Sequence, residues 1–233
     1  MRILSLAPFP PFLACPPVSG GAMHIVRPLI ALGETGRYLI SLLFPALSPD
    51  HVHQVTNYLQ GRRGFERVSG VIYKKELNNS SGLREWLPDG AFHLYTSSGY
   101  REALAGALRD RFDIVVLETS YLLWAVPLIR EIQPWARIVL DLQNVEHLLL
   151  QRMVESGSPA EKEKYLFEYR KTLDWERRLW PTVDYCMAVS SLEAEIFNSH
   201  APLVPVGIVV AGGGVDLGSV SGSANPGVSP LDI

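Results

Sequence analysis

The chain has 233 residues, of which 47% are apolar and 19% charged, with a formal net charge of −3 and a pI near 6.1. Its high apolar fraction and small net charge exclude disorder as the main state, and the mildly acidic balance argues against a dedicated nucleic-acid binder. Its length allows one large domain or two small ones. The two cysteines, Cys15 and Cys186, lie far apart and form neither a disulfide framework nor a metal-site spacing, which suits a reducing cytosol.

Neither end of the sequence carries a segment typical of secretion or membrane insertion. The apolar run at residues 2–7 is too short for a signal peptide, and the run at 201–210 is too short for a transmembrane helix and contains Pro202 and Pro205. The sequence therefore predicts a cytoplasmic protein, either soluble or attached to the inner face of the membrane. A modest basic cluster reads as ordinary surface, or else as a contact with anionic lipid; it consists of Arg62, Arg63, Arg67, Lys74 and Lys75.

The N-terminal segment predicts a strand, a loop and a helix. Residues 2–7 read as a buried strand, and a proline-rich loop follows as far as Gly20 and Gly21. From Ala22 onward apolar residues recur at helical spacing. Pro28 lies inside this helix, where it is tolerated only in the first turn or at a kink.

Strand and helix patterns then alternate along the rest of the chain. A second strand is expected at 38–44, whereas residues 45–90 show no clear period and predict only a short strand near 68–73. Ser97 and Ser98 are good helix N-caps. The elements expected after them are a helix over 100–108, a strand over 113–118, a helix over 121–132, a strand over 137–142, helices over 145–155 and 159–180, a strand over 184–190, a helix over 191–199 and a strand over 203–210.

This order of elements predicts an α/β fold with a Rossmann-like, mainly parallel sheet and helices on both faces. Strands separated by helices form right-handed βαβ units. Ligands of such sheets bind at the carboxyl ends of the strands. The segments that this rule selects are 8–21, 118–120, 143–147, 190–193 and 212–216.

The glycine pair Gly20-Gly21 lies where the first helix opens. Backbone N–H groups at a helix N-terminus attract phosphate, and glycine allows close approach, but a flexible loop entering a helix explains the pair slightly better from spacing alone. A dinucleotide fingerprint and a Walker motif are both missing from the sequence, which argues against a standard site of either type.

A polar segment follows the strand at 137–142. Asn144 could be an N-cap with Glu146 complementing the helix dipole, or Gln143, Asn144 and Glu146 could line a ligand cleft as hydrogen-bonding groups; the residues alone favour neither. His147 stands among leucines and is interpreted as structural. The other histidines show no spacing typical of a metal site or a catalytic triad; they are His24, His51, His53, His93 and His200.

Five segments in order resemble the N-terminal domain of GT-B fold glycosyltransferases of the large family 4 type. They are a glycine-pair loop at 17–22, an Asp-Ile-Val strand at 113–117, the sequence Asp-Leu-Gln-Asn-Val-Glu at 141–146, a run ending in Ala-Val-Ser-Ser-Leu-Glu at 176–193, and a turn at 210–217. The resemblance covers residues 2–217. It implies one glycosyltransferase-like domain over 1–217 and a flexible tail or truncated interdomain linker over 218–233.

The sequence departs from the family pattern at three places. Gln143 stands where many relatives have histidine, and glutamine cannot titrate near neutral pH. Gly212 and Gly213 replace a proline and an asparagine. The family's donor-binding C-terminal domain has no counterpart after Asp216, so we expect this chain alone to transfer no sugar.

The resemblance implies transfer of a hexose from a nucleotide sugar to a glycan or lipid-linked acceptor, with retention and without a metal or other cofactor. By carry-over, Gln143 and Glu146 are the expected catalytic residues, and Gly20 and Gly21 contact the donor phosphates through their amides. The expected acceptor-binding residues are Asn144, Glu118, Ser190 and Glu193. A departing nucleotide diphosphate needs fixed dipoles and cations around it.

Three other interpretations stay open. The chain could be a non-catalytic half-enzyme or binding module that pairs with a separate donor-binding chain. It could be an unrelated Rossmann-like nucleotide enzyme, which the missing phosphate fingerprint disfavours. It could also be a fragment without an independent role.

Overall fold

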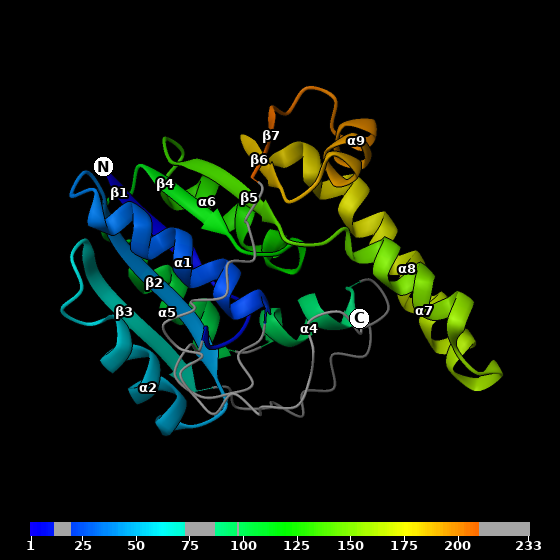
Figure 1. The fold of residues 1–233 in the computed structure, drawn as a ribbon, viewed down its shortest axis with the longest axis horizontal. Coiled ribbons are helices and arrows are strands. Elements are labelled where there is room, and N and C mark those ends of the chain that lie inside the picture. The colour runs from blue at the N-terminus through cyan, green and yellow to red at the C-terminus, as the bar shows by residue number, and fades with distance from the viewer. Residues whose placement is uncertain (12–19, 73–86, 97, 210–233) are drawn as a thin grey trace, which may run out of the picture.

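A computed structural model describes residues 1–11, 20–72, 87–96 and 98–209. Seven parallel strands form one sheet in the order β3-β2-β1-β4-β5-β6-β7 (Figure 1). The strands are β1 (Arg2–Leu6), β2 (Leu39–Ala46), β3 (Phe65–Ile72), β4 (Ile114–Leu117), β5 (Arg137–Leu142), β6 (Tyr185–Ala188) and β7 (Val206–Ile208). The predicted Rossmann-like parallel sheet is confirmed. The expected domain boundary at residue 217 lies outside the described residues.

Helices connect successive strands. They are α1 (Gly20–Glu34), α2 (Pro49–Leu59), α4 (Asp89–Thr96), α5 (Ser98–Ala107), α6 (Val126–Ile132), α7 (Glu146–Ser156), α8 (Pro159–Leu179) and α9 (Ser191–His200), with 3-10 turns η1 (Ser120–Ala125) and η2 (Trp180–Thr182). The α7–α8 pair extends away from the sheet as a long hairpin (Figure 1). Within the described ranges, every helix is too short or too polar to cross a membrane.

Both faces of the sheet are covered, as predicted. On β2, Leu42 and Phe44 lie in a buried cluster with Ile25 of α1, whereas Leu43, between them, lies in a second cluster with Tyr100 of α5. Successive side chains of a strand point to opposite faces, so each face has its own hydrophobic core. This double burial explains why the strands read as nearly continuous apolar runs.

The structure corrects several expected elements. Residues 45–90 contain α2 and the start of α4, and neither helix was expected. Ser48 is the N-cap of α2, and its hydroxyl accepts a hydrogen bond from the His51 N–H. The helix buries Val55 and Leu59, which recur with Val52 at helical spacing, a signal that the sequence interpretation missed. The helix expected over 121–132 is divided into η1 and α6, because Pro127 occupies the first turn of α6, where an N–H group is dispensable. Strand β7 is shorter than expected, since residues 202–204 form turns.

The strand order reverses between β1 and β4. Strand β1 pairs with β2 on one side and with β4 on the other, and between β3 and β4 the chain returns from the edge of the sheet to its centre. Such a switch point leaves a crevice at the carboxyl ends of the two strands. It is therefore the place in this sheet where a ligand site is expected.

Glycines allow the backbone of α1 to lie directly against the turn that precedes β3. Gly64 has φ +86°, and a Cβ atom there would overlap with the backbone of Gly33. Gly61, with φ +84°, has open space around the same position. We expect Gly64→Ala to lower the free energy of unfolding by about 2–4 kcal/mol and Gly61→Ala by about 1 kcal/mol, since only the first adds overlap to backbone strain. Urea unfolding of the two variants measures the difference, and equal losses would show that the overlap is relieved.

Candidate functional site

Three polar side chains gather on the α1 face of the sheet at the switch point. In the register of β4 and β5, Leu117 lies beside Leu140, and both belong to the core on the opposite face. The next residues, Glu118 and Asp141, therefore lie side by side under α1. Ser5 of β1 joins them, and its hydroxyl donates a hydrogen bond of 2.6 Å to Glu118 Oε1.

Helix α1 adds a histidine to this cluster. His24 Nε2 lies 3.2 Å from Asp141 Oδ2 and 3.4 Å from Asp141 Oδ1. The hydrogen bond with Asp141 raises the pKa of His24 above its usual 6.5, and the negative charge of Glu193 adds to the effect, whereas burial opposes it. The histidine therefore titrates on the basic side of its ordinary range.

Glu118 is the more enclosed of the two acids in the cluster. Only 3% of the residue is exposed, and its carboxyl group is hydrogen-bonded to both Ser5 and Asp141. Burial, followed by the neighbouring Asp141 carboxylate, raises the pKa of Glu118 well above its usual range. Glu118 was expected to bind the acceptor, and the structure places it beside Asp141, the partner of His24.

Glu146 lies at the start of α7, beside the end of β4. The Thr119 hydroxyl lies 3.4 Å from Glu146 Oε1, and Tyr121 also bonds to this carboxyl group. Burial and the nearby Glu176 raise the pKa of Glu146 to about 7. Because this value exceeds that of an unfolded carboxyl group, the resulting stabilisation is complete below about pH 4.5 and is lost as the pH rises through about 7.

The residues that precede Glu146 differ in burial and in hydrogen bonding. Gln143 is partly buried, and its Nε2 atom has no hydrogen-bond partner among the described residues. Asn144 is exposed, and the structure excludes the N-cap, one of its two open interpretations, because Val145 occupies that position. The free N–H groups of Glu146 and His147 instead donate to the Glu176 carboxylate of α8, at 3.1 and 3.3 Å.

His147 has a structural role, as expected. Its Nδ1 atom lies 2.6 Å from Glu176 Oε2, and both side chains are buried. Its ring lies near those of Trp180, Tyr169 and His200. The pair joins α7 to α8 behind the carboxyl edge of the sheet.

Ser190 and Glu193 lie at the carboxyl end of β6, as predicted. Ser190 caps α9 by accepting a hydrogen bond from the Glu193 N–H at 3.3 Å, and its hydroxyl also contacts Glu193 Oε2 at 3.1 Å. The charge of Glu193 acts on both His24 and Cys186. This cap is therefore part of the electrostatic surroundings of the cluster.

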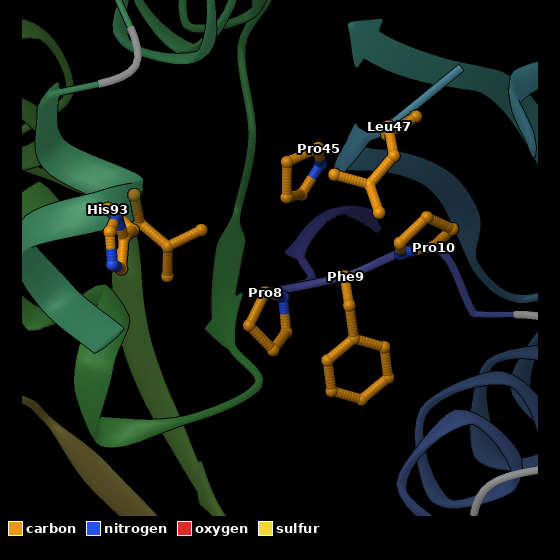
Figure 2. Close-up of a pocket in the computed structure, with 8 residues that line it drawn as sticks. Pro8, Phe9, Pro10, Pro45, Leu47 and His93 are labelled. Atoms are coloured by element: carbon orange, nitrogen blue, oxygen red, sulfur yellow. The ribbon is translucent and has the colours of Figure 1, made fainter. Parts of the chain in front are cut away.

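A cavity of about 420 Å³ opens at the ends of β1 and β2. Figure 2 shows Pro45 and Leu47 on one side of it, Pro8 and Phe9 below them, and His93 of α4 across from Leu47. The lining residues are Pro8, Phe9, Pro10, Pro45, Ala46, Leu47, His93 and Leu94. Apart from His93, these side chains are apolar, so the cavity suits an apolar group rather than a charged one.

Two predicted features are only partly visible. Gly20 and Gly21 begin α1, as expected for a helix-opening pair, but residues 12–19 before them lie outside the described part of the chain. The turn at 210–217 lies outside it as well. Among the residues that are described, no group of three His, Cys, Asp or Glu side chains could hold a metal ion.

The sequence interpretation missed His24 and did not assign Asp141 to the site. A signal for them existed. Each of the strands at 113–118 and 137–142 carries one acid near its carboxyl end, and each acid directly follows a buried leucine, Leu117 or Leu140, so both acids point to the same face of the sheet. His24 follows the glycine pair by one helical turn, which places it above this edge. Histidine spacing along the sequence alone could not find a pair that lies 117 residues apart.

No protein-family model matches the sequence, and no curated protein matches it. Among solved structures, UGT71G1 of Medicago truncatula in complex with UDP-glucose superposes with a TM-score of 0.53 at 12% identity, over 98% of this chain and 54% of that one. UGT2 of Phytolacca americana, complexed with UDP-2-fluoro-glucose and pterostilbene, gives 0.49 at 15% identity, over 88% and 52%. The N-terminal domain of trehalose-6-phosphate phosphatase from Candida albicans gives 0.46 at 15% identity, over 86% and 42%.

The chain thus spans about half the length of the structures it matches. At these identities the similarity concerns the fold. The order of the parallel sheet and the superposition on UGT71G1 agree with the GT-B half-domain fold that the resemblance implies, whereas membership of family 4 stays a prediction. The chain has the Rossmann-like fold of one half of a GT-B glycosyltransferase.

Proposed function

We propose that this chain is the acceptor-binding half of a glycosyltransferase that moves a hexose from a nucleotide sugar to an acceptor hydroxyl. The observation that carries the proposal is the His24–Asp141 pair at the switch point of a GT-B half-domain fold. A hydroxyl is a weak nucleophile until a base removes its proton, and a histidine oriented by a carboxylate is suited to that task. The resemblance implied catalytic roles for Gln143 and Glu146, and we add the titratable His24–Asp141 pair to them.

The remaining polar groups of this edge suit binding rather than proton removal. The Gln143 amide could donate to an oxygen of the sugar or the acceptor. Glu146, with a pKa of about 7, could donate a hydrogen bond when protonated and accept one when ionised. Gly20 and Gly21 keep their proposed contact with the donor phosphates, because backbone N–H groups at the start of α1 favour an anion.

The apolar cavity supports an acceptor that carries an apolar group, such as an isoprenoid or an aromatic ring, next to its hydroxyl. Within the expected alternatives, this favours a lipid-linked acceptor over an unmodified glycan. As the donor, UDP-glucose is the first compound to test, because UGT71G1 holds it in its complex. The donor-binding half is proposed to be a second domain or a separate chain.

The acceptor site is tested on the 233-residue chain with 4-methylumbelliferone and farnesol as probes, by fluorescence and calorimetry. We expect Leu47→Asp, which places a charge at the cavity, to weaken binding about 10-fold or more. Leu203→Asp is the matched control, since Leu203 is 95% exposed and does not line the cavity. Equal affinities for the two variants, or no binding of either probe, would contradict an apolar acceptor site here.

The anomeric configuration of the product tests the mechanism. A base that activates the acceptor hydroxyl for direct attack opposite the leaving group gives inversion, by the same logic as base-activated water in inverting glycosidases. The family 4 resemblance implies retention. Proton NMR of the product, formed with the donor-binding half present, distinguishes the two, and a retained configuration would argue against His24 as the base.

A further inference from the structure

Two buried carboxyl groups lie side by side behind His24. Glu118 is 3% exposed and Asp141 5%, and the two residues occupy matching positions at the ends of paired strands. Two negative charges this close in a poorly solvated interior repel strongly, so a pair of this kind keeps one proton between its members. The pair then carries a single negative charge.

The contacts of the two groups indicate which one keeps the proton. Asp141 faces the His24 imidazole at 3.2 Å, so its negative charge has a partner that can become a cation. Glu118 has the Ser5 hydroxyl at 2.6 Å and the Asp141 carboxyl group as hydrogen-bond partners. A hydroxyl can donate to a neutral carboxylic acid as well as to a carboxylate, and a neutral Glu118 still has its own O–H to donate.

We propose that Glu118 is a positioning residue for the His24–Asp141 pair, accepting a hydrogen bond from Ser5 and donating its own carboxylic proton to Asp141. The result is a hydrogen-bonded chain in the order Ser5, Glu118, Asp141 and His24. The proposal rests on the proposed function, because it assigns Glu118 a role through a pair that acts on the acceptor.

This arrangement has two physical consequences. The hydrogen bond fixes Asp141 in its orientation toward His24, and the neutral state of Glu118 limits the negative charge near the imidazole. With both carboxyl groups ionised, His24 would remain an imidazolium ion at neutral pH and could not accept a proton. The other polar or titratable groups of the described residues that act on the carboxyl pair or on His24 are Ser5, Tyr100, Cys186 and Glu193.

An NMR titration of His24 in the 233-residue chain separates the alternatives. Glu118→Gln keeps a neutral hydrogen-bond donor, so the pKa of His24 is expected to stay within about 0.3 of the native value. Asp141→Asn removes the charged partner and is expected to lower the pKa of His24 by about 1 or more. A decrease in Glu118→Gln as large as that in Asp141→Asn would overturn the proposal, because it would mean that Glu118 is ionised.

Removing the hydrogen-bond donor of Glu118 tests whether this residue positions Asp141. Glu118→Leu leaves the Asp141 carboxylate without this hydrogen bond, which is expected to raise the pKa of His24 by about 0.7. A side chain that only filled space would leave that pKa unchanged in Glu118→Leu, and this result would also overturn the proposal.

Infrared spectroscopy detects the proton directly. The difference spectrum of the native chain minus Glu118→Gln at pH 7 is expected to contain the carbonyl band of a protonated carboxylic acid. For exposed Glu66, which pairs with Arg2, the corresponding Glu66→Gln difference contains carboxylate bands only. Carboxylate bands at Glu118 would overturn the proposal. These readouts do not depend on sugar transfer, so an active His24→Ala enzyme would reject the proposed function while leaving the proton on Glu118 open to measurement.

Discussion

Replacing His24 with alanine should lower kcat/KM for sugar transfer about 10³-fold, the usual contribution of a positioned general base. The variant removes the only described side chain that pairs with Asp141 by an ionic contact while leaving the apolar cavity intact. Acceptor binding should therefore change little, and the loss should appear in kcat. The measurement is steady-state transfer from UDP-glucose by this chain together with its donor-binding half.

The pH profile identifies the same group. Because Asp141 raises the pKa of His24, the rate should fall as the pH drops through a value above 6.5, where the imidazole becomes protonated. Asp141→Asn should move this acid limb to lower pH and reduce the maximal rate. His53→Ala, at an exposed position of α2, is the control and should match the native enzyme in both respects. A native rate and profile in His24→Ala would reject the proposed base.

The sheet could be predicted from the sequence because burial on both faces leaves a simple pattern. The runs that form β4 and β6 follow an acid, the run that forms β5 follows Pro134, and all three strands were expected within two residues of their bounds. Helices α2 and α4 could not be predicted in the same way. Helix α2 buries only Val55 and Leu59, whereas the strands are apolar almost throughout. Val52, Val55 and Leu59 do recur at helical spacing, and the sequence interpretation overlooked this signal.

The positions of the candidate residues in the fold were predicted in outline, but the pairing of His24 with Asp141 was not. The rule that ligands bind at carboxyl strand ends directed attention to Glu118, to Gln143 and Glu146, and to Ser190 and Glu193, and the structure places these residues at that edge; their roles stay predictions. The His24–Asp141 contact joins α1 to β5 across the whole first half of the chain, and only strand order and register place the two residues together. The Asn144 cap failed for a related reason, because the true acceptor for the α7 N–H groups comes from another helix.

That acceptor gives the largest expected effect on stability. Glu176 is completely buried, and its carboxylate accepts hydrogen bonds from the Glu146 N–H, the His147 N–H and His147 Nδ1. Glu176→Ala would leave two backbone donors and a buried imidazole without their acceptor. We expect the free energy of unfolding to fall by about 3–5 kcal/mol, because each buried donor that loses its acceptor costs about 1–3 kcal/mol. Urea unfolding followed by tryptophan fluorescence measures it, since Trp180 lies against His147.

Two further variants distinguish the loss of the Glu176 carboxylate from a general effect of substitution in α8. Glu163→Ala removes an exposed glutamate of α8 and should change the free energy of unfolding by less than about 0.5 kcal/mol. Glu176→Gln keeps one acceptor oxygen and should lose less than Glu176→Ala. A loss below about 1 kcal/mol in Glu176→Ala would mean that water or another group replaces the cap. The substitution also affects the site. Without the negative charge of Glu176, the pKa of Glu146 should fall below about 7. Glu176 therefore caps the start of α7 and also influences the protonation of Glu146, the first residue of that helix.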